Sequence, residues 1–141
     1  MNTTPPAGCS DEETQSKHAI PLPNGLVFHL TSQEMLYCAR YLFREIFTQQ
    51  RYYRKGFEIR PNDTVVDIGA NMGMFTLWAA PQASTGRVLA VEPAQQPFEC
   101  LQFNVTQNRL ANVAVRQDAV GERGVQLEMV EYPKLNMVSH H

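Results

Sequence analysis

The sequence predicts an α/β fold with a parallel, doubly wound sheet, and three observations lead to it. Residues 64–68 are apolar and β-branched without polar alternation, as in a strand covered on both faces, and a glycine-containing turn follows at 69–73. Residues 87–92 form a second buried strand that ends in an acid, and residues 113–117 form a third. Stretches of helical character, one of them at 97–110, separate these strands. Strands that alternate with helices in this way are typical of a Rossmann-like fold.

The N-terminal part of the chain divides into a tail and a strand–helix segment. Residues 1–19 are rich in Thr, Pro, Ser and acids and lack periodicity, so we expect a flexible tail. Within the segment 20–55, the turn Asn24-Gly25 precedes an apolar run at 26–30, which suggests an entering hairpin or an edge strand. A helix with an apolar stripe at helical spacing should follow.

The remaining chain is expected to hold a partial Rossmann-like domain at residues 56–132 and a tail at 133–141. Its length fits one domain. The run 125–132 is strand-like, but we do not count it as a fourth core strand. The sheet is therefore predicted to be truncated after the third core strand.

The turn after the first core strand indicates what kind of ligand it holds. A strand that breaks into a glycine turn and restarts as a helix is expected to present backbone amides and a helix N-terminus to a small ligand. A P-loop would need a lysine and a hydroxyl that are absent here, and a dinucleotide fingerprint would need glycine where Asn71 stands. The acid Asp67 just before the turn repels pyrophosphate but accepts hydrogen bonds from an ammonium group. S-adenosylmethionine fits this pattern better than NAD.

Glu92 ends the second strand, 25 positions after Asp67. This offset is close to the roughly 20 residues at which a ribose-binding carboxylate is expected in nucleotide sites. Both ribose hydroxyls can donate to one carboxylate. The alternative is an acid that caps the following helix, since Pro93 and Pro97 mark a helix start.

Four segments carry a resemblance to a known family. They are DIGANMGMF at 67–75, VEP at 91–93, PFECLQFNVTQNRL at 97–110 and VAVRQDAVGERG at 113–124. Together they resemble class I methyltransferases that use S-adenosylmethionine, and more narrowly the FkbM-type family. Asn104 and Asn108 match that family's N-x-x-x-N helix, and residues 119–121 match its A-V-G turn. The resemblance covers roughly residues 26–130.

The resemblance implies further cofactor contacts on either side of the turn. Glu45 and Tyr52 match an acid and a tyrosine near the amino-acid end of the cofactor, with Tyr53 as the alternative if the register shifts by one. Asp118 and Ala119 match positions beside the adenine, although a turn-forming aspartate is the alternative. The full set expected to bind S-adenosylmethionine is Glu45, Tyr52, Asp67, Gly69, Ala70, Asn71, Gly73, Phe75, Glu92, Pro93, Asp118 and Ala119.

The resemblance also implies that the acceptor side of the enzyme is missing from this chain. In the family, the fourth core strand and later segments carry an acidic motif and complete the acceptor pocket, and nothing after Gly124 matches them. We therefore expect a methyltransferase that acts on the hydroxyl of a small molecule such as a sugar or polyketide, with this chain as its cofactor-binding half. No catalytic residue can be assigned, and whether the chain itself is an enzyme stays open.

A non-catalytic cofactor-binding or interaction module is the alternative function. An exposed sheet edge after the third strand would support it, because an uncovered edge pairs with a second copy or with a complementing segment. A short NAD-dependent enzyme is disfavoured by Asn71 and by the lack of a Tyr/Lys pair on one helix.

Composition argues against several other classes of partner. The formal net charge is −2 and the basic residues are scattered, so we expect no nucleic-acid footprint. No apolar run approaches the roughly 18 residues of a membrane span. Cys9, Cys38 and Cys100 have no metal-ligand or paired spacing, which indicates reduced thiols, a cytoplasmic location and no metal site.

Overall fold

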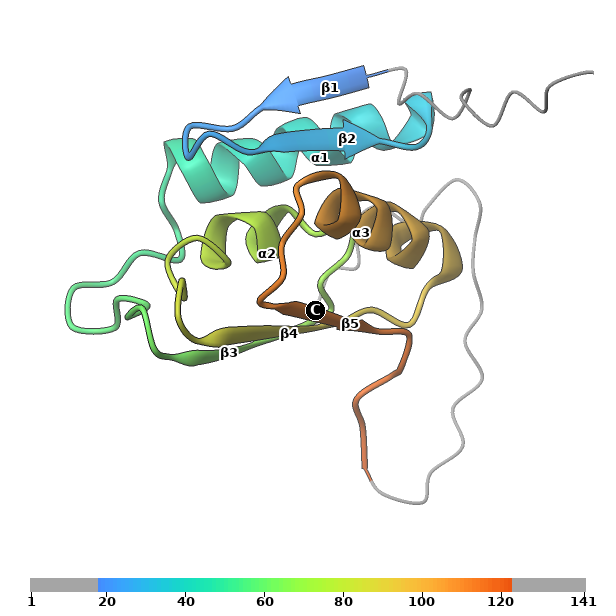
Figure 1. Ribbon diagram of the computed structural model, residues 1–141. Helices are drawn as coiled ribbons and strands as arrows, with labels where there is room; N and C mark the ends of the chain where they lie inside the picture. The colour runs from blue at the N-terminus through green and yellow to red at the C-terminus, as the bar shows by residue number, and fades with distance from the viewer. Residues whose placement is uncertain (1–17, 123–141) are drawn as a thin grey trace, which may run out of the picture.

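A three-stranded parallel sheet forms the base of the protein in the computed structural model, which describes residues 18–122 (Figure 1). Its strands are β3 (Thr64–Ile68), β4 (Arg87–Val91) and β5 (Val113–Arg116), in the order β3-β4-β5. The predicted α/β, Rossmann-like fold with three core strands is confirmed. The second and third strands each end one residue earlier than the sequence indicated.

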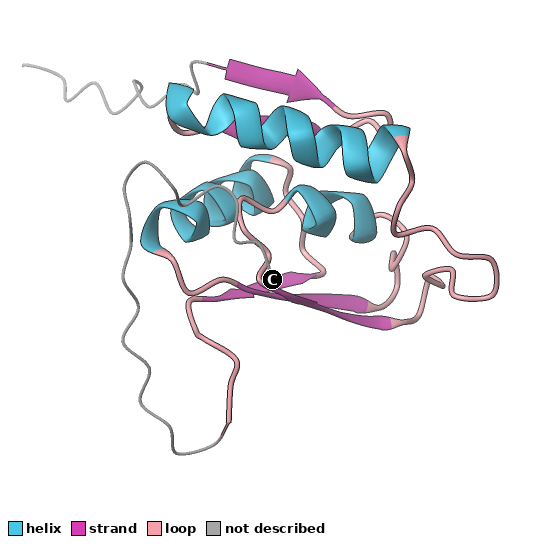
Figure 2. Ribbon diagram, turned by 180° about the vertical axis from the view of Figure 1, so that it is seen from behind, coloured by secondary structure: helices cyan, strands magenta, loops and turns pink. Residues whose placement is uncertain are grey.

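Two helices connect the strands and lie over the same face of the sheet (Figures 1 and 2). These are α2 (Met74–Ala79), between β3 and β4, and α3 (Gln95–Gln107), between β4 and β5. Within the described residues no element covers the opposite face, where Val66 and Ile68 are 54% and 62% exposed. The apolar run of β3 predicted cover on both faces, and the described part supplies it on one.

A β-hairpin and a helix form a further layer above α2 and α3 (Figure 1). The hairpin strands β1 (His18–Pro21) and β2 (Val27–Leu30) are antiparallel, which confirms the expected hairpin. β1 begins two residues inside the range that the sequence assigned to a tail. A short 3₁₀ helix, η1 (Gln33–Met35), then leads into α1 (Leu36–Phe43), which continues as a π-helical turn, η2 (Arg44–Thr48).

The largest hydrophobic cluster lies between this upper layer and α2, and not against the sheet. It joins Phe28 and Leu30 of β2 to Ala39 of α1, to Met72 of the glycine turn and to Leu77 of α2, and each of these is almost fully buried. Burying a side chain of this size contributes roughly 1.5–3 kcal/mol. The hairpin therefore takes part in holding the turn and α2 in place. A smaller cluster of Ala70, Ala90 and Leu101 packs α3 on the sheet.

Three sequence predictions lie outside the described residues. They concern the thiol Cys9, the strand-like run 125–132 and the tail at 133–141. Most of the tail predicted at 1–19 lies there too.

Candidate functional site

Two buried carboxylates meet at the carboxyl ends of neighbouring strands. Asp67 is the fourth residue of β3 and is 9% exposed, and Glu92 directly follows β4 and is 7% exposed. Because β3 and β4 are parallel, their carboxyl ends lie at the same edge of the sheet, and Asp67 stands beside Ala90 in the register. Ligands of open α/β sheets bind outside this edge. The structure therefore brings together the two acids that the sequence singled out.

The glycine turn 69–73 bridges the two acids, and all of its backbone amides are bonded within the protein. The amides of Gly69 and Ala70 both donate to the Val91 carbonyl, at 2.9 and 3.0 Å. The Asn71 amide donates to Oε2 of Glu92 at 2.8 Å. The Met72 amide donates to the Asn71 side-chain oxygen at 2.8 Å, and the Gly73 amide to the Ala70 carbonyl at 2.9 Å.

This arrangement changes the expectation about how the turn would bind a ligand. The sequence predicted that backbone amides and a helix N-terminus would face it. In the structure those five N–H groups already have acceptors, so the turn itself contributes few free donors, and the first N–H groups of the six-residue helix α2 remain as donors. Beside them the site presents carboxylate oxygen, which accepts hydrogen bonds.

Left-handed backbone conformations explain which residues the turn requires. Gly69, Asn71 and Gly73 have φ values of 73°, 52° and 90°, a region that glycine enters freely and that asparagine tolerates better than most residues. Gly73 is constrained further by α3, because a Cβ atom at this position would lie 2.7 Å from Cδ1 of Leu101. A Cβ atom at Gly69 would meet nothing within 4 Å.

Glu92 supports the site as well as lining it. Its Oε2 accepts from Asn71, and its Oε1 accepts from the backbone amide of Ala94 at 2.9 Å. Ala94 is the N-cap residue of α3, so the alternative prediction, an acid at the start of the next helix, describes part of what this side chain does. A carboxylate has about four lone-pair positions, so each oxygen can accept one further hydrogen bond.

Asp67 is held by the first helix after the turn. The Thr76 hydroxyl in α2 donates to Oδ2 of Asp67 at 2.6 Å, and Thr76 is fully buried. Burial raises the pKa of Asp67, the hydrogen bond from Thr76 lowers it, and the neighbouring charge of Glu92 raises it again. The net shift is upward, as expected for an acid whose charge is poorly solvated. A cation bound nearby would stabilise the charged form of Asp67.

The two aromatic residues predicted to contact the cofactor, Tyr52 and Phe75, belong to one cluster of tilted rings. Phe75, in the first turn of α2, packs between Tyr52 and Trp78, with ring centroids 5.0 and 5.2 Å apart. Tyr52 is 53% exposed and so leaves part of its ring open to a ligand. Its neighbour Tyr53, the alternative in the sequence, instead lines a hollow of about 350 Å³ next to Trp78.

Glu45, the acid paired with Tyr52 in the prediction, lies on η2 and binds other residues of its own segment. It accepts from the Tyr41 hydroxyl at 2.8 Å and pairs with Arg51 at 2.8 Å. At the opposite side of the site, Asp118 pairs with Arg116 at 2.7 Å, and both side chains are exposed. Both acids would have to share these partners in order to contact a ligand.

The remaining predicted residues lie along the turn and the strand ends. Ala70 is buried, Pro93 is half-buried after β4, and Ala119 is exposed beyond β5. Two buried polar residues with contacts to the site were given no role by the residue pattern. Thr76 reads as an ordinary helix residue, and Asn104 was noted only as a family position, although a buried amide in the middle of a helix needs partners.

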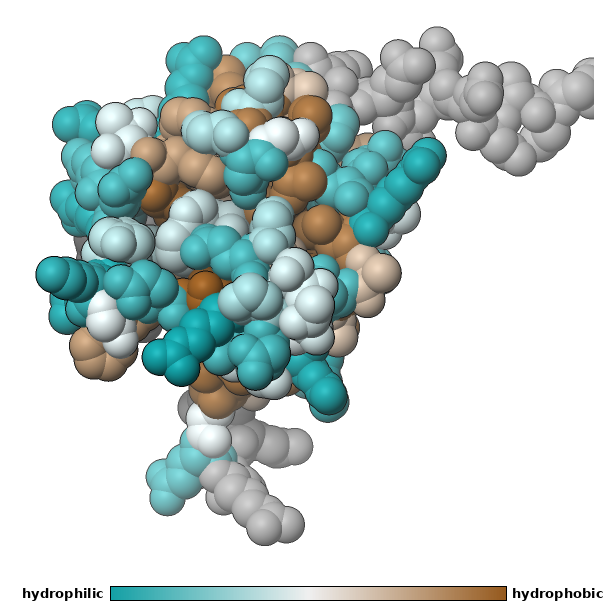
Figure 3. Space-filling model, turned by 60° about the vertical axis from the view of Figure 1, so that its left-hand side comes forward, coloured by the Kyte–Doolittle hydropathy of each residue, from teal (hydrophilic) through white to brown (hydrophobic). Residues whose placement is uncertain are grey.

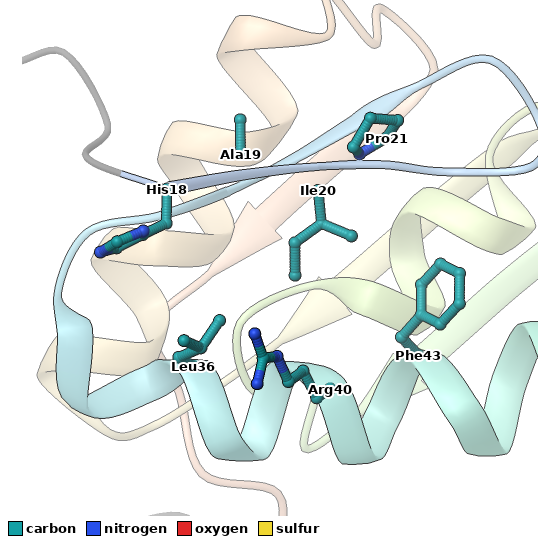
Figure 4. Close-up of a pocket in the computed structure, with 7 residues that line it drawn as sticks. All are labelled: His18, Ala19, Ile20, Pro21, Leu36, Arg40 and Phe43. Atoms are coloured by element: carbon teal, nitrogen blue, oxygen red, sulfur yellow. The ribbon is translucent and has the colours of Figure 1, made fainter.

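Two hollows in the described part of the structure lie away from this edge of the sheet. One of about 550 Å³ lies between β1 and α1, where Ile20, Leu36 and Phe43 form apolar walls and Arg40 points inward (Figure 4). The side of the molecule seen in Figure 3 mixes hydrophilic residues with separate hydrophobic patches. Size alone therefore does not locate the site, and its chemistry does.

Neither a metal centre nor a membrane-spanning helix is found in residues 18–122. No group of three or more His, Cys, Asp or Glu side chains is placed to hold a metal ion there. No helix of this part is long and apolar enough to cross a bilayer. Cys38 and Cys100 are buried thiols, and burial raises the pKa of Cys38 to about 11.

Similarity to known proteins decides the family. The chain is 42% identical over 121 residues to the 31-O-demethyl-FK506 methyltransferase FkbM of Streptomyces tacrolimicus, a match that covers 85% of this chain and 45% of that protein. The chain belongs to the FkbM-type family of S-adenosylmethionine-dependent methyltransferases. No family model matches it, so the assignment rests on individual relatives.

Other methyltransferases also match this FkbM-type chain. Methyltransferase 1 of Beauveria bassiana is 31% identical over 96 residues, which cover 67% of this chain and 37% of that protein. Among solved structures, a SAM dependent methyltransferase from Aquifex aeolicus is 20% identical with a TM-score of 0.49, covering 59% of this chain and 46% of that one. The chain thus spans less than half the length of the curated relatives it matches.

Proposed function

We propose that this FkbM-type chain binds S-adenosylmethionine at the carboxyl ends of β3 and β4. The observation that carries the proposal is a pair of buried carboxylates, Asp67 and Glu92, beside a turn whose amides are already bonded. A site with two buried carboxylates, beside a turn whose own amides are used internally, favours a ligand that brings a positive charge and hydroxyl groups. It disfavours phosphate, which needs donors and is repelled by carboxylates.

Each part of the cofactor has a matching group in this arrangement. Asp67 accepts from the ammonium group, directly or through water, and Glu92 accepts from the two ribose hydroxyls with the lone pairs that Asn71 and Ala94 leave unused. Asp118 accepts from the amino group of adenine while keeping its pair with Arg116. Tyr52, in contact with Phe75, and Glu45 flank the amino-acid end.

The complete protein is proposed to methylate a hydroxyl oxygen of a small molecule. S-adenosylmethionine supplies a methyl group on a positively charged sulfur when it is bound. A hydroxyl acceptor would receive that methyl group from the sulfonium and would lose its proton to a general base. The protein orients the reacting atoms, and no residue of this chain is assigned as the base. The Streptomyces relative is named a 31-O-demethyl-FK506 methyltransferase, and this name supports an oxygen acceptor.

In this proposal the chain provides the cofactor-binding half of the enzyme. The uncovered sheet face, with exposed Val66 and Ile68, favours a second candidate as well, an interaction module whose exposed face packs against a complementing segment or a second copy. To separate the half-enzyme from the interaction module, methyl transfer is measured with the chain alone and with the chain mixed with a segment that supplies the remaining strands. Transfer in either assay supports the half-enzyme, and no transfer in both favours the interaction module.

A small metabolite remains the proposed acceptor, and the cytoplasm the proposed location. The net charge of −2 gives no support for a nucleic-acid acceptor. The buried thiols Cys38 and Cys100 fit a reducing compartment.

Isothermal titration of the purified chain with S-adenosylmethionine tests the cofactor site. We expect a dissociation constant of roughly micromolar order, about 8 kcal/mol of binding free energy, for the cofactor and for its demethylated product. NAD serves as the matched control, because it shares the adenosine but adds a pyrophosphate, and it should not bind. A chain that is folded by circular dichroism yet gives no heat with the cofactor would contradict the proposal.

A further inference from the structure

We propose that Asn104 is a positioning residue that holds the glycine turn of the cofactor site in place. The inference rests on the proposed function, because it takes residues 69–73 as the turn that receives the cofactor. Asn104 lies in the middle of α3, is fully buried, and has the Met72 carbonyl of the turn among its hydrogen-bond acceptors.

Asn104 and Asn108 bind the edge of β2 that does not pair with β1. The Asn104 side chain accepts from the His29 amide at 2.7 Å and donates to the His29 carbonyl at 2.9 Å. Asn108 makes the same pair of bonds with Val27, at 2.9 and 2.7 Å. Four residues of helix rise about 6.0 Å, and two residues of strand rise about 6.6–6.8 Å. The N-x-x-x-N spacing, from Asn104 in α3 to its C-cap residue Asn108, therefore matches every second residue of β2.

These side-chain amides take the place of a neighbouring strand. In an antiparallel pair the backbone groups of alternate residues point to opposite edges. Val27 and His29 bond to α3, which leaves Phe28 and Leu30 to face β1, opposite Ile20 and His18. Covering the second edge of β2 fixes the hairpin on α3 and protects backbone groups that would otherwise be open.

Asn104 does more than Asn108, because it also reaches the cofactor turn. Its amide nitrogen lies 3.3 Å from the Met72 carbonyl and 3.0 Å from the Cys100 carbonyl, in addition to the His29 carbonyl. Two N–H protons are thus shared among three carbonyl groups, so the side chain is fully engaged and has one orientation. Asn108 has no such bond to the turn, since its third contact is the Asn104 carbonyl of its own helix.

The bond to Met72 places Asn104 directly behind the ligand-facing residues. Met72 stands next to Asn71, whose amide is held by Glu92, and next to Gly73, which packs on Leu101 of α3. The turn is thereby held on its ligand-facing side by the Glu92 carboxylate and on the side of α3 by the Asn104 amide. Loss of the rear contact should let the turn open, so that Glu92 no longer meets the ribose in one fixed geometry.

Asn104→Ala and Asn108→Ala form a matched pair that separates the two roles. Both variants lose two bonds to β2, so we expect both to lower the free energy of unfolding in urea. Only Asn104→Ala should speed hydrogen exchange of the Asn71 amide, measured by NMR under conditions where each variant stays folded. It should also weaken S-adenosylmethionine binding by about tenfold more than Asn108→Ala does, about 1.4 kcal/mol.

Asn104→Ser keeps the test informative if Asn104→Ala does not fold. Its shorter hydroxyl can bond the Cys100 carbonyl one turn back in the helix but should not reach Met72. Equal exchange of the Asn71 amide and equal affinity in the position 104 and position 108 variants would overturn the inference. A wild-type chain that does not bind the cofactor would instead overturn the proposed function. In that case, faster exchange of the Asn71 amide in the position 104 variant alone would still support the role of Asn104 in holding the turn.

Discussion

Replacement of Glu92 by alanine should damage both the stability of the turn and cofactor binding. The carboxylate accepts one hydrogen bond from the Asn71 amide and one from the Ala94 amide. A hydrogen bond to a charged group contributes about 1.5–3 kcal/mol. Both contacts are only partly buried, so water can replace some of this loss, and the lower end of the range applies to each. We therefore expect Glu92→Ala to lower the free energy of unfolding by about 3 kcal/mol.

Glu92→Gln separates the structural role from the proposed ribose role. Glutamine keeps the length of the side chain and one acceptor oxygen, so it can retain one of the two backbone bonds and should lose about half as much stability. The remaining oxygen keeps one lone pair and can accept from only one ribose hydroxyl, without the negative charge, and the new NH₂ group cannot accept from the second hydroxyl. Both variants should therefore weaken S-adenosylmethionine binding by at least tenfold, about 1.4 kcal/mol.

Urea unfolding followed by circular dichroism measures the stability, and isothermal titration measures the affinity. Glu99→Gln is a matched control, because Glu99 lies on the exposed side of α3 and accepts a hydrogen bond from the exposed Gln95 side chain. It should change neither quantity. Unchanged titration heat in Glu92→Gln would discard the ribose assignment, and unchanged unfolding of Glu92→Ala would show that the two backbone bonds do not hold the turn.

Three further predictions concern the turn and the sheet. Gly73→Ala should lower the free energy of unfolding in urea by about 2–4 kcal/mol, because backbone strain and the clash with Leu101 combine. Gly69→Ala should lose only the roughly 1–2 kcal/mol of a left-handed backbone, and equal losses in the two variants would refute the clash. The pKa of Asp67 is raised in the folded protein, so ionisation of Asp67 opposes folding, and the free energy of unfolding should fall as pH rises through that pKa. Cofactor affinity should rise over the same pH range, and Asp67→Asn should abolish both trends. Ile68→Lys should reduce self-association in sedimentation velocity, and an isolated wild-type chain that is already monomeric would contradict an interface at this face.

The residue pattern was sufficient for those parts of the fold that depend on local signals. The β-branched run of β3 and the two glycines after it located the first strand and its turn to within a residue. Parallel pairing then follows from a helix between each pair of strands, and it places Asp67 and Glu92 at one edge. Both acids could therefore be singled out before the structure was known.

The contacts of the turn could not be predicted in the same way. Whether an amide faces a ligand or a neighbouring carbonyl depends on the position of β4, and the Val91 carbonyl takes the amides of Gly69 and Ala70. The role of Asn104 depends on the hairpin, 75 positions away in the sequence, lying along α3. Such partners come from tertiary packing, which neither periodicity nor local propensity encodes.

The choice of cofactor gains a physical reason that the sequence argument lacked. Asn71 was counted against NAD because it occupies a position that the dinucleotide fingerprint gives to glycine. In the structure the stronger reason is that the amides of this turn are used to build it, so a pyrophosphate would find carboxylates where it needs donors. Asp67 stays buried with a raised pKa, an arrangement that costs folding stability and is favourable only when a cation neutralises it. A site that keeps two buried acids and uses its own amides internally is therefore suited to a positively charged nucleoside, and S-adenosylmethionine is such a ligand.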